Sequence, residues 1–150
     1  MAHALRIPYY RLAPQPFQTL QTPSHAVSRE LLGARLIDLV FLRASQINGC
    51  AFCMDMHWRD LVRLGADPRH LNTVAGWRES PFFSDRERAA LRWTEIVTDI
   101  ARSDSGDDEF ARLQQQFNDE EIAHLSFAIA AINAWNRISV SLRNPVPQGV

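Results

Sequence analysis

The sequence predicts an all-α protein of six or seven helices, and two observations support this fold class. Apolar residues recur at helical spacing through the longer segments, and no alternation of apolar and polar residues continues beyond three or four positions. Glycine, proline, asparagine and aspartate stand between these segments, where turns and helix caps require them. The length of 150 residues fits one domain spanning 1–150.

The first fifteen residues are expected to be irregular, because Pro8, Pro14 and Pro16 act as helix breakers. Tyr9 and Tyr10 are apolar enough to favour an arm that lies across a neighbouring surface. A frayed terminus is the alternative. The segment is therefore assigned no helix of its own.

Two helical regions are predicted before the cysteines. The segment 17–32 is either one helix interrupted at Pro23 or two short helices, since proline removes a backbone donor and Ser24 can cap a new start. Gly33 ends this segment. The segment 34–46 is a clear helix, because its apolar residues form a stripe at helical spacing.

Capping signals continue after the cysteines. The helix that carries them is expected to run to Leu64, and Asp67-Pro68 then opens a helix that reaches about Trp77. Ser84 begins a long helix, and Glu87 three residues later completes a capping box. Each of these boundaries is a local signal that does not depend on the rest of the fold.

The last two helices follow a polar loop. Asp107 or Asp108 caps a shorter helix that ends near Phe117, and Asn118 or Asp119 caps the final helix. The final helix is apolar on nearly all sides, which predicts that it is buried.

Two asparagines, Asn133 and Asn136, lie on one face of this final helix, which ends by Asn144-Pro145. Buried amides need hydrogen-bond partners. We therefore expect both side chains to bind backbone groups of a neighbouring helix or loop. A direct role in substrate binding is the alternative.

Composition excludes several classes of function. The net charge of −1 gives no reason to expect a nucleic acid or an anionic membrane as a partner. All sixteen basic residues are arginine, so no lysine is present to form a Schiff base. No apolar run is long enough to span a membrane, and no signal peptide is recognised, so a cytoplasmic protein is expected. A disulfide in that compartment would be transient and catalytic.

The chemistry of the chain centres on its only two cysteines, Cys50 and Cys53. They follow the turn signal Asn48-Gly49 and fall in the first turn of a helix, where free N–H groups and the helix dipole favour a thiolate. We expect these two residues to be close enough to form a disulfide. His57 lies four residues after Cys53 on the same helix face, so an imidazole stands one turn from a thiol and can take its proton.

The cysteine pair has other interpretations. The cysteines are buried small hydrophobes in the simplest one, with His57 a solvated helix residue. A structural zinc site needs a second ligand pair at comparable spacing, and none is present, so no metal is predicted. A thioredoxin-like motif lies between strands, and no strand is predicted here. No motif for a flavin or nicotinamide cofactor is found.

The run from Leu42 to His57, which contains SQINGC, closely resembles the core motif of the alkylhydroperoxidase D-like proteins of the carboxymuconolactone decarboxylase superfamily. That motif is an acidic residue, eleven residues, Cys-x-x-Cys, three residues and a histidine. The resemblance continues in 81–91 and 131–137, and it covers most of the chain from about Leu31 onwards.

The resemblance implies roles for four residues. Cys53 would be the peroxidatic thiol and Cys50 the resolving thiol, while His57 and Asp38 would form a proton relay. The chain departs from the pattern at Asp38, where glutamate is usual, and at Phe52, where the founding enzyme has histidine. We therefore expect Asp38 to reach His57 through water, or to anchor the SQINGC turn. Without the motif, a solvated first-turn acid is the alternative interpretation of Asp38.

The sequence thus predicts a thiol-dependent peroxidase that needs no cofactor. It would reduce a small hydroperoxide and be restored by an external dithiol or a thiol protein. The resemblance also implies a homo-oligomer, as a trimer or hexamer. Three alternatives stay open: a disulfide oxidoreductase or redox sensor, a non-redox enzyme of the decarboxylase type, and an oligomeric scaffold without activity.

Overall fold

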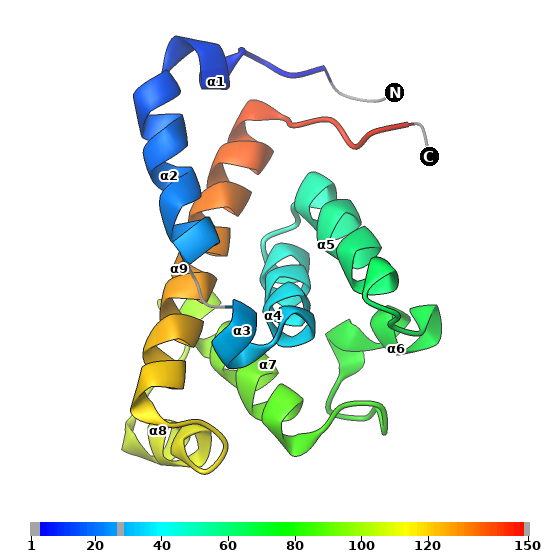
Figure 1. Ribbon diagram of the computed structural model, residues 1–150, viewed down its shortest axis with the longest axis vertical. Helices are drawn as coiled ribbons and strands as arrows, with labels where there is room; N and C mark the ends of the chain where they lie inside the picture. Colours follow the sequence, from blue (N-terminus) through cyan, green and yellow to red (C-terminus); the bar gives the residue numbers. More distant parts are fainter. Residues whose placement is uncertain (1–3, 27–28, 149–150) are drawn as a thin grey trace.

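A computed structural model describes residues 4–26 and 29–148, and every regular element in these ranges is a helix. The predicted all-α class is therefore confirmed (Figure 1). The elements in order are α1 (Tyr9–Leu12), α2 (Pro14–Ala26), α3 (Arg29–Leu32), α4 (Ala34–Ile47), α5 (Ala51–Arg63), α6 (Pro68–Asn72), the 3₁₀ turn η1 (Val74–Gly76), α7 (Asp85–Thr98), α8 (Asp107–Gln114) and α9 (Asp119–Leu142).

The described ranges hold nine α-helices, so the prediction of six or seven was too low. The difference comes from short elements, chiefly α1 and α3 of four residues each. The expectation of an irregular N-terminus was also wrong. Pro14 and Pro16 lie in the first turn of α2, where the backbone N–H groups have no partner within the helix, so proline costs little. The helix continues past Pro23 to Ala26.

The helix expected from residue 68 to about 77 is shorter than predicted. Asp67 caps α6 and Pro68 is its first residue, as expected, but the helix ends at Asn72. Thr73 then donates its hydroxyl to the carbonyl of His70, and a hydroxyl that competes in this way for backbone groups disfavours continuation of a helix. The predicted capping box of Ser84 and Glu87 is confirmed at the start of α7. The corresponding box of α9 is formed by Asn118 and Glu121.

Helix α4 is the centre of the fold, and α5, α7 and α9 all pack against it (Figure 1). Its apolar residues are buried on two sides. Ile37, Val40 and Phe41 join a core with α7, α8 and α9. Leu39 and Leu42 join a second core with α5, α6 and α7. The CxxC-bearing helix α5 therefore lies directly on the most central helix and starts where that helix ends.

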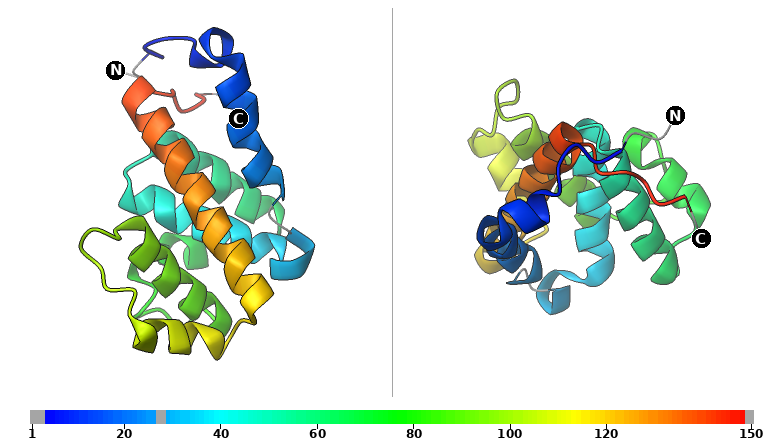
Figure 2. Two further views of the ribbon diagram at one scale, coloured as in Figure 1. Left: turned by 90° about the vertical axis from the view of Figure 1, so that its left-hand side faces the viewer. Right: turned by 90° about the horizontal axis from the view of Figure 1, so that it is seen from above.

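The N-terminal helices cover one side of α9 (Figure 2). Helix α2 packs along α9, and Phe17 meets Trp135 edge-on with ring centroids 5.5 Å apart. The backbone N–H of Arg6 donates to the carbonyl of Leu142, so the two described ends of the chain lie together. The predicted arm does lie across a neighbouring surface, although much of it is helical. This surface belongs to the helices around the cysteines.

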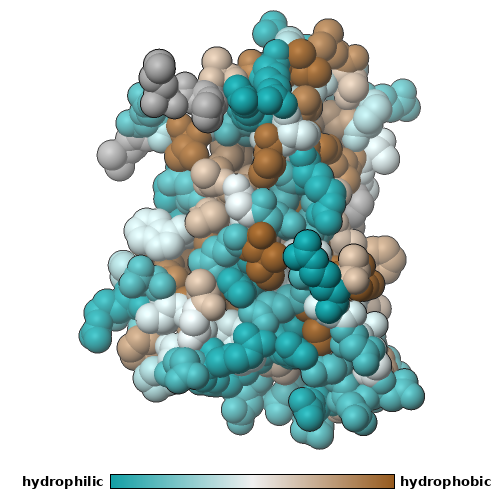
Figure 3. Space-filling view, turned by 180° about the vertical axis from the view of Figure 1, so that it is seen from behind, coloured by the Kyte–Doolittle hydropathy of each residue, from teal (hydrophilic) through white to brown (hydrophobic). Residues whose placement is uncertain are grey.

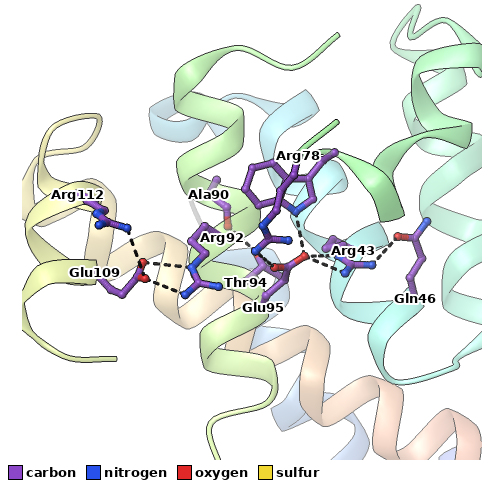
Figure 4. A network of polar contacts seen from close by, with 10 residues as sticks. Arg43, Gln46, Arg78, Ala90, Arg92, Thr94, Glu95, Glu109 and Arg112 are labelled. Carbon is purple, nitrogen blue, oxygen red and sulfur yellow. Dashed lines mark hydrogen bonds and ion pairs between the residues drawn. The ribbon is translucent and has the colours of Figure 1, made fainter. Parts of the chain in front are cut away.

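A charge cluster around Glu95 connects α4 and α7 to the turn after η1 (Figure 4). Its half-buried carboxylate accepts hydrogen bonds from Arg43, Arg78 and the indole of Trp77, at 2.6–2.9 Å. Burial raises the pKa of Glu95, but the bonds from Arg78, Trp77 and Arg43 outweigh it and hold the pKa below its usual range.

We expect Glu95→Gln to lower the free energy of unfolding by about 1–3 kcal/mol, because two guanidinium groups lose their shared counter-charge. Since the folded pKa of Glu95 is lowered, its contribution is present above the unfolded pKa of about 4.3 and is lost as the pH falls through the folded value. Urea unfolding should therefore show a smaller difference in the free energy of unfolding between the wild type and Glu95→Gln at pH 3 than at pH 7. The control Asp55→Asn, which breaks a partly exposed ion pair with Arg59, should cost less than about 1 kcal/mol.

On the face opposite to that of Figure 1, apolar residues form small separate patches among hydrophilic side chains (Figure 3). Exposed apolar side chains include Ile100 and Phe127, at 64% and 68% exposure. Of the helices described, none combines the length and the apolar character that a membrane span needs.

Candidate active site

The site begins at the turn between α4 and α5. Helix α4 ends in a Schellman turn, in which the N–H of Gly49 bonds the carbonyl of Gln46 and the N–H of Cys50 bonds that of Ser45. Gly49 has φ of +67°, a left-handed conformation that glycine adopts at little cost. The turn ends at Cys50, which is the N-cap of α5.

The two cysteines form a disulfide, with their Cα atoms 5.4 Å apart. The prediction that Cys50 and Cys53 are close enough to bond is therefore confirmed. The backbone N–H of Cys53 also donates to the Cys50 sulfur at 3.3 Å, as to an N-cap side chain. Both cysteines are buried, each at only 2% exposure. The segment 143–148, which follows α9, lines a cavity together with Cys50.

His57 and Asp38 meet beneath the disulfide, from α5 and α4 respectively. The ring nitrogen Nδ1 of His57 lies 3.3 Å from Oδ1 of Asp38, and both side chains are buried. The expected water bridge is therefore wrong, since the two groups are in direct contact. The interpretation of Asp38 as a solvated residue is also wrong, because this side chain is 1% exposed.

Arg29 of α3 is the third member of this group. Its guanidinium binds both oxygens of Asp38, at 2.9 and 3.1 Å. Burial raises the pKa of Asp38, but its contacts with His57 and Arg29 outweigh burial and hold the pKa below its usual value. The carboxylate is thus charged at neutral pH. Its well-aligned hydrogen bonds come from Arg29 and not from His57.

The ring nitrogens of His57 have unused hydrogen-bonding capacity in the described part of the chain. Within the described ranges, no group meets hydrogen-bond geometry with either nitrogen, and the 3.3 Å contact with Asp38 is not aligned as a hydrogen bond. The ring is held by packing, with its centroid 4.9 Å from that of Phe41. A buried imidazole with an unbonded nitrogen is available to exchange a proton with a group entering the site.

The SQINGC turn is anchored by the two asparagines of α9, and not by Asp38 as expected. The side-chain amide of Asn48 donates to Asn133 and Asn136, at 2.9 Å each. Asn136 donates in turn to Ser45, and Asn133 donates to Thr98 of α7 and to the carbonyl of Ile129. The predicted structural role is confirmed, although most partners are side chains where backbone groups were expected.

A cavity of about 340 Å³ opens beside Cys53 and His57, and we call it the Cys53 cavity. Most of its wall is aromatic or aliphatic. It is lined by Tyr9, Phe17, Gln21, Phe41, Phe52, Cys53, Met56, His57, Ile132, Trp135, Ser139 and Asn144. Three of these residues come from the N-terminal helices, which lie outside the predicted site. The only early signal was the apolar character of the arm around Tyr9 and Tyr10.

One further feature bears on metals. Ligand atoms of Asp38, His57 and Asp60 lie within 4.8 Å of one another, a spacing that a divalent cation can use. Both oxygens of Asp38 already accept hydrogen bonds from Arg29, however. The guanidinium therefore supplies the positive charge of this cluster, and the donors that face the cysteines are an imidazole and the dithiol.

These features define a helical protein with a disulfide at a helix N-terminus and a histidine one turn away. Residues 17–95 match the model of the Carboxymuconolactone decarboxylase family. The uncharacterized protein YdfG of Bacillus subtilis (strain 168) is 32% identical over 139 residues, which cover 93% of this chain and 95% of that protein. The chain belongs to the carboxymuconolactone decarboxylase family and is an alkylhydroperoxidase D-like member of it.

Solved structures agree with this assignment. A protein of unknown function from Agrobacterium tumefaciens, described as a candidate antioxidant defence protein AhpD, is 42% identical with a TM-score of 0.92, over 97% of this chain and 100% of that chain. An uncharacterized peroxidase-related protein from Ralstonia eutropha JMP134, described as an alkylhydroperoxidase AhpD core, has a TM-score of 0.80 at 19% identity, over 91% and 73% of the two chains. The second likeness concerns the fold alone.

Proposed function

We propose that this protein is a thiol-dependent peroxidase in which Cys53 reacts with the hydroperoxide. The observation that carries the proposal is the shared cavity of Cys53 and His57, with Cys50 already in bonding position behind it. A peroxidatic thiol needs a base to take its proton, access for the peroxide and a second thiol nearby. This arrangement supports all three requirements.

The reaction starts from the reduced dithiol. The Cys53 thiolate attacks one oxygen of the hydroperoxide, the O–O bond breaks, and the alkoxide leaves as an alcohol after taking a proton from His57. Cys53 becomes a sulfenic acid. The Cys50 thiolate then attacks that sulfur and releases water, which forms the disulfide. The helix N-terminus and the N–H of Cys53 favour the thiolate of Cys50 at this step.

The walls of the Cys53 cavity favour an organic hydroperoxide over hydrogen peroxide. Burial of a ligand's carbon skeleton against aromatic and aliphatic side chains favours binding. Hydrogen peroxide has no carbon skeleton to bury. The polar groups that line the cavity, such as Gln21 and Asn144, are few and can orient the peroxide oxygens. The class of substrate is therefore a small hydroperoxide with an apolar substituent.

The test is thiol titration of the reduced protein before and after one equivalent of cumene hydroperoxide. We expect two thiols per chain to be lost, and the loss to be faster than with the same amount of hydrogen peroxide. Unchanged thiols would refute the peroxidase proposal. If the protein then still exchanged disulfides with a dithiol, it would act as a disulfide oxidoreductase. If it did neither, a non-redox decarboxylase-type activity would be tested next.

We expect Asp38→Asn to lower peroxide turnover by less than about tenfold, well below the roughly 10²–10⁴-fold of a full general acid–base group. The reason is that Arg29 binds both oxygens of Asp38, while the contact with His57 is poorly aligned. Steady-state turnover with cumene hydroperoxide measures the effect. A loss of 100-fold in a variant that unfolds at the same urea concentration as the wild type would restore Asp38 to a full part in the relay.

An oligomer, which the family resemblance implies, and a cytoplasmic location belong to the same proposal. A trimer or hexamer stays a prediction, which light scattering on the purified protein measures directly. A cytoplasmic location is consistent with reduction of the disulfide after each turnover, since thiols keep that compartment reducing. The reductant would be an external dithiol or a thiol protein.

A further inference from the structure

Cys50 and Cys53 line different cavities. Cys50 lies on a cavity of about 430 Å³, which we call the Cys50 cavity, between the start of α5, the end of α9 and the segment 143–148. Figure 1 shows these three parts at the same end of the molecule. Phe52, Ser139 and Asn144 line both cavities and so separate the two openings. One disulfide can therefore be approached from two sides, at a different sulfur from each.

The Cys50 cavity carries positive charge. Arg143 is its only ionisable lining side chain apart from the cysteine, and no acidic residue of the described chain lines it. The first amides of α5 also face this region with their positive dipole end. The last carbonyls of α9 form the negative end of a helix dipole and would oppose this positive charge. Those of Ser141 and Leu142 already accept hydrogen bonds from Arg6.

Within residues 4–26 and 29–148, nothing pairs with the guanidinium of Arg143, which leaves it available to a ligand. None of the ion pairs or side-chain hydrogen bonds in the described residues involves it, and the residue is exposed. Most other arginines of the structure bind a carboxylate or a carbonyl, as Arg29, Arg43 and Arg86 do. Among the described residues, the cation beside Cys50 thus has no counter-charge.

The backbone at Arg143 adds a second, independent observation. Helix α9 ends in the same Schellman turn as α4 and α5, with the N–H of Asn144 bonding the carbonyl of Ser139. In α4 and α5 the left-handed position is Gly49 and Gly65, whereas α9 has Arg143 there at φ of +59°. A side chain at this position is strained, and such strain is typical of functional residues.

We propose that the Cys50 cavity is the reductant site and that Arg143 selects low-molecular-weight thiols that carry a carboxylate. This inference rests on the redox use of the cysteine pair in the proposed function. The burial of Cys50 also favours a small thiol, because a small molecule that enters the cavity reaches a buried sulfur more readily than a protein thiol does. The peroxide and the reductant would then enter from different sides, and neither needs to leave before the other arrives.

The chemistry is thiol–disulfide exchange at Cys50. The thiolate of the reductant attacks the Cys50 sulfur, the bond to Cys53 breaks, and Cys53 leaves as a thiolate that takes a proton through His57. A second reductant thiolate attacks the mixed disulfide at the reductant sulfur and releases Cys50. Two reductant thiols have become one disulfide, and their two protons and two electrons reside on the two cysteines.

The test measures reduction of the oxidised full-length protein without any peroxide. Three thiols of similar size are compared: 3-mercaptopropionate, 2-mercaptoethanol and cysteamine, which carry a negative, no and a positive charge. Free protein thiols are trapped with a maleimide over time. Each rate is divided by the thiolate concentration present and by the rate at which the same thiolate reduces an uncharged small disulfide, because intrinsic nucleophilicity differs between thiols. We expect mercaptopropionate to react about threefold or more faster than mercaptoethanol, and cysteamine to be slowest, with the differences shrinking at high salt.

The variants separate a charge effect from a structural one. Arg143→Gly removes the cation and also relieves the left-handed backbone, so it should fold at least as well as the wild type. Arg143→Gln and Arg143→Gly should abolish the preference for the carboxylate, and Arg143→Glu should reverse it. Arg112→Gln, an equal charge change on α8, should leave the preference intact.

Each outcome bears on the inference alone. Equal rates for the three thiols in the wild type, or an unchanged preference in the Arg143 variants, would overturn it. So would much faster reduction by a thiol protein than by any of the small thiols. Because no peroxide is present, none of these results depends on peroxidase activity. The peroxidase proposal is decided separately, by the thiol titration with cumene hydroperoxide.

Discussion

Replacing Cys53 by serine should abolish peroxide reduction, because the hydroxyl that replaces the thiol is not ionised near neutral pH and cannot attack the O–O bond. Cys53 is the cysteine that shares a cavity with His57, so we expect it to be the one oxidised first. In Cys53→Ser, one equivalent of cumene hydroperoxide should consume no thiol on the timescale of wild-type turnover. This is the largest effect that we predict for any single substitution.

The reverse variant, Cys50→Ser, serves as the matched control. It keeps Cys53, His57 and the Cys53 cavity, so the first chemical step should still occur once, and the sulfenic acid should persist for want of a resolving thiol. Trapping with dimedone followed by mass spectrometry should locate the adduct on Cys53. An adduct on Cys50 in the Cys53→Ser variant, with none in Cys50→Ser, would invert the assignment of the two thiols.

His57→Phe should slow oxidation of Cys53 by about 10²–10⁴-fold, which is the usual contribution of general acid–base catalysis. The substitution is conservative for packing, because His57 is buried, lies against Phe41 and makes no well-aligned hydrogen bond that phenylalanine would lose. The loss should therefore appear in the chemistry and not in the stability. Stopped-flow oxidation of the reduced protein under single-turnover conditions measures the rate of this step.

A second histidine offers the control for this experiment. His70 stacks on Phe82 with ring centroids 4.0 Å apart, and it lies in α6, outside the Cys53 cavity. His70→Phe should leave the oxidation rate within about twofold of the wild type. If His57→Phe reacted as fast as the wild type while unfolding at the same urea concentration, the role of His57 as proton carrier would be refuted.

The cysteine site was predictable because its spacing is local. Cys50, Cys53 and His57 lie within two turns of one helix, where a separation in sequence translates directly into a position on a face. The Asn48-Gly49 turn and the capping boxes of α7 and α9 are likewise decided by neighbouring residues. Such features depend on backbone geometry over four to six residues, so they can be recognised before the fold is known.

Other parts of the site join segments that are distant in the sequence. Nothing in the neighbouring sequence marks Arg29 as a site residue, because only the position of α3 in the fold brings it to Asp38. Tyr9 and Phe17 become cavity walls only because α1 and α2 pack over the cysteines and α9. The bond from Asn48 to Asn136 spans 88 residues. No local pattern contains these pairings.

The sequence by itself therefore determined the helical class, the dithiol at a helix N-terminus and the histidine on the same face. Only the tertiary structure decided that Asp38 is buried and shared with Arg29, and that Cys50 and Cys53 open toward different cavities. The physical reason is that helix propensity and capping act between near neighbours. Burial, shared charges and cavities arise where helices from distant parts of the chain pack together.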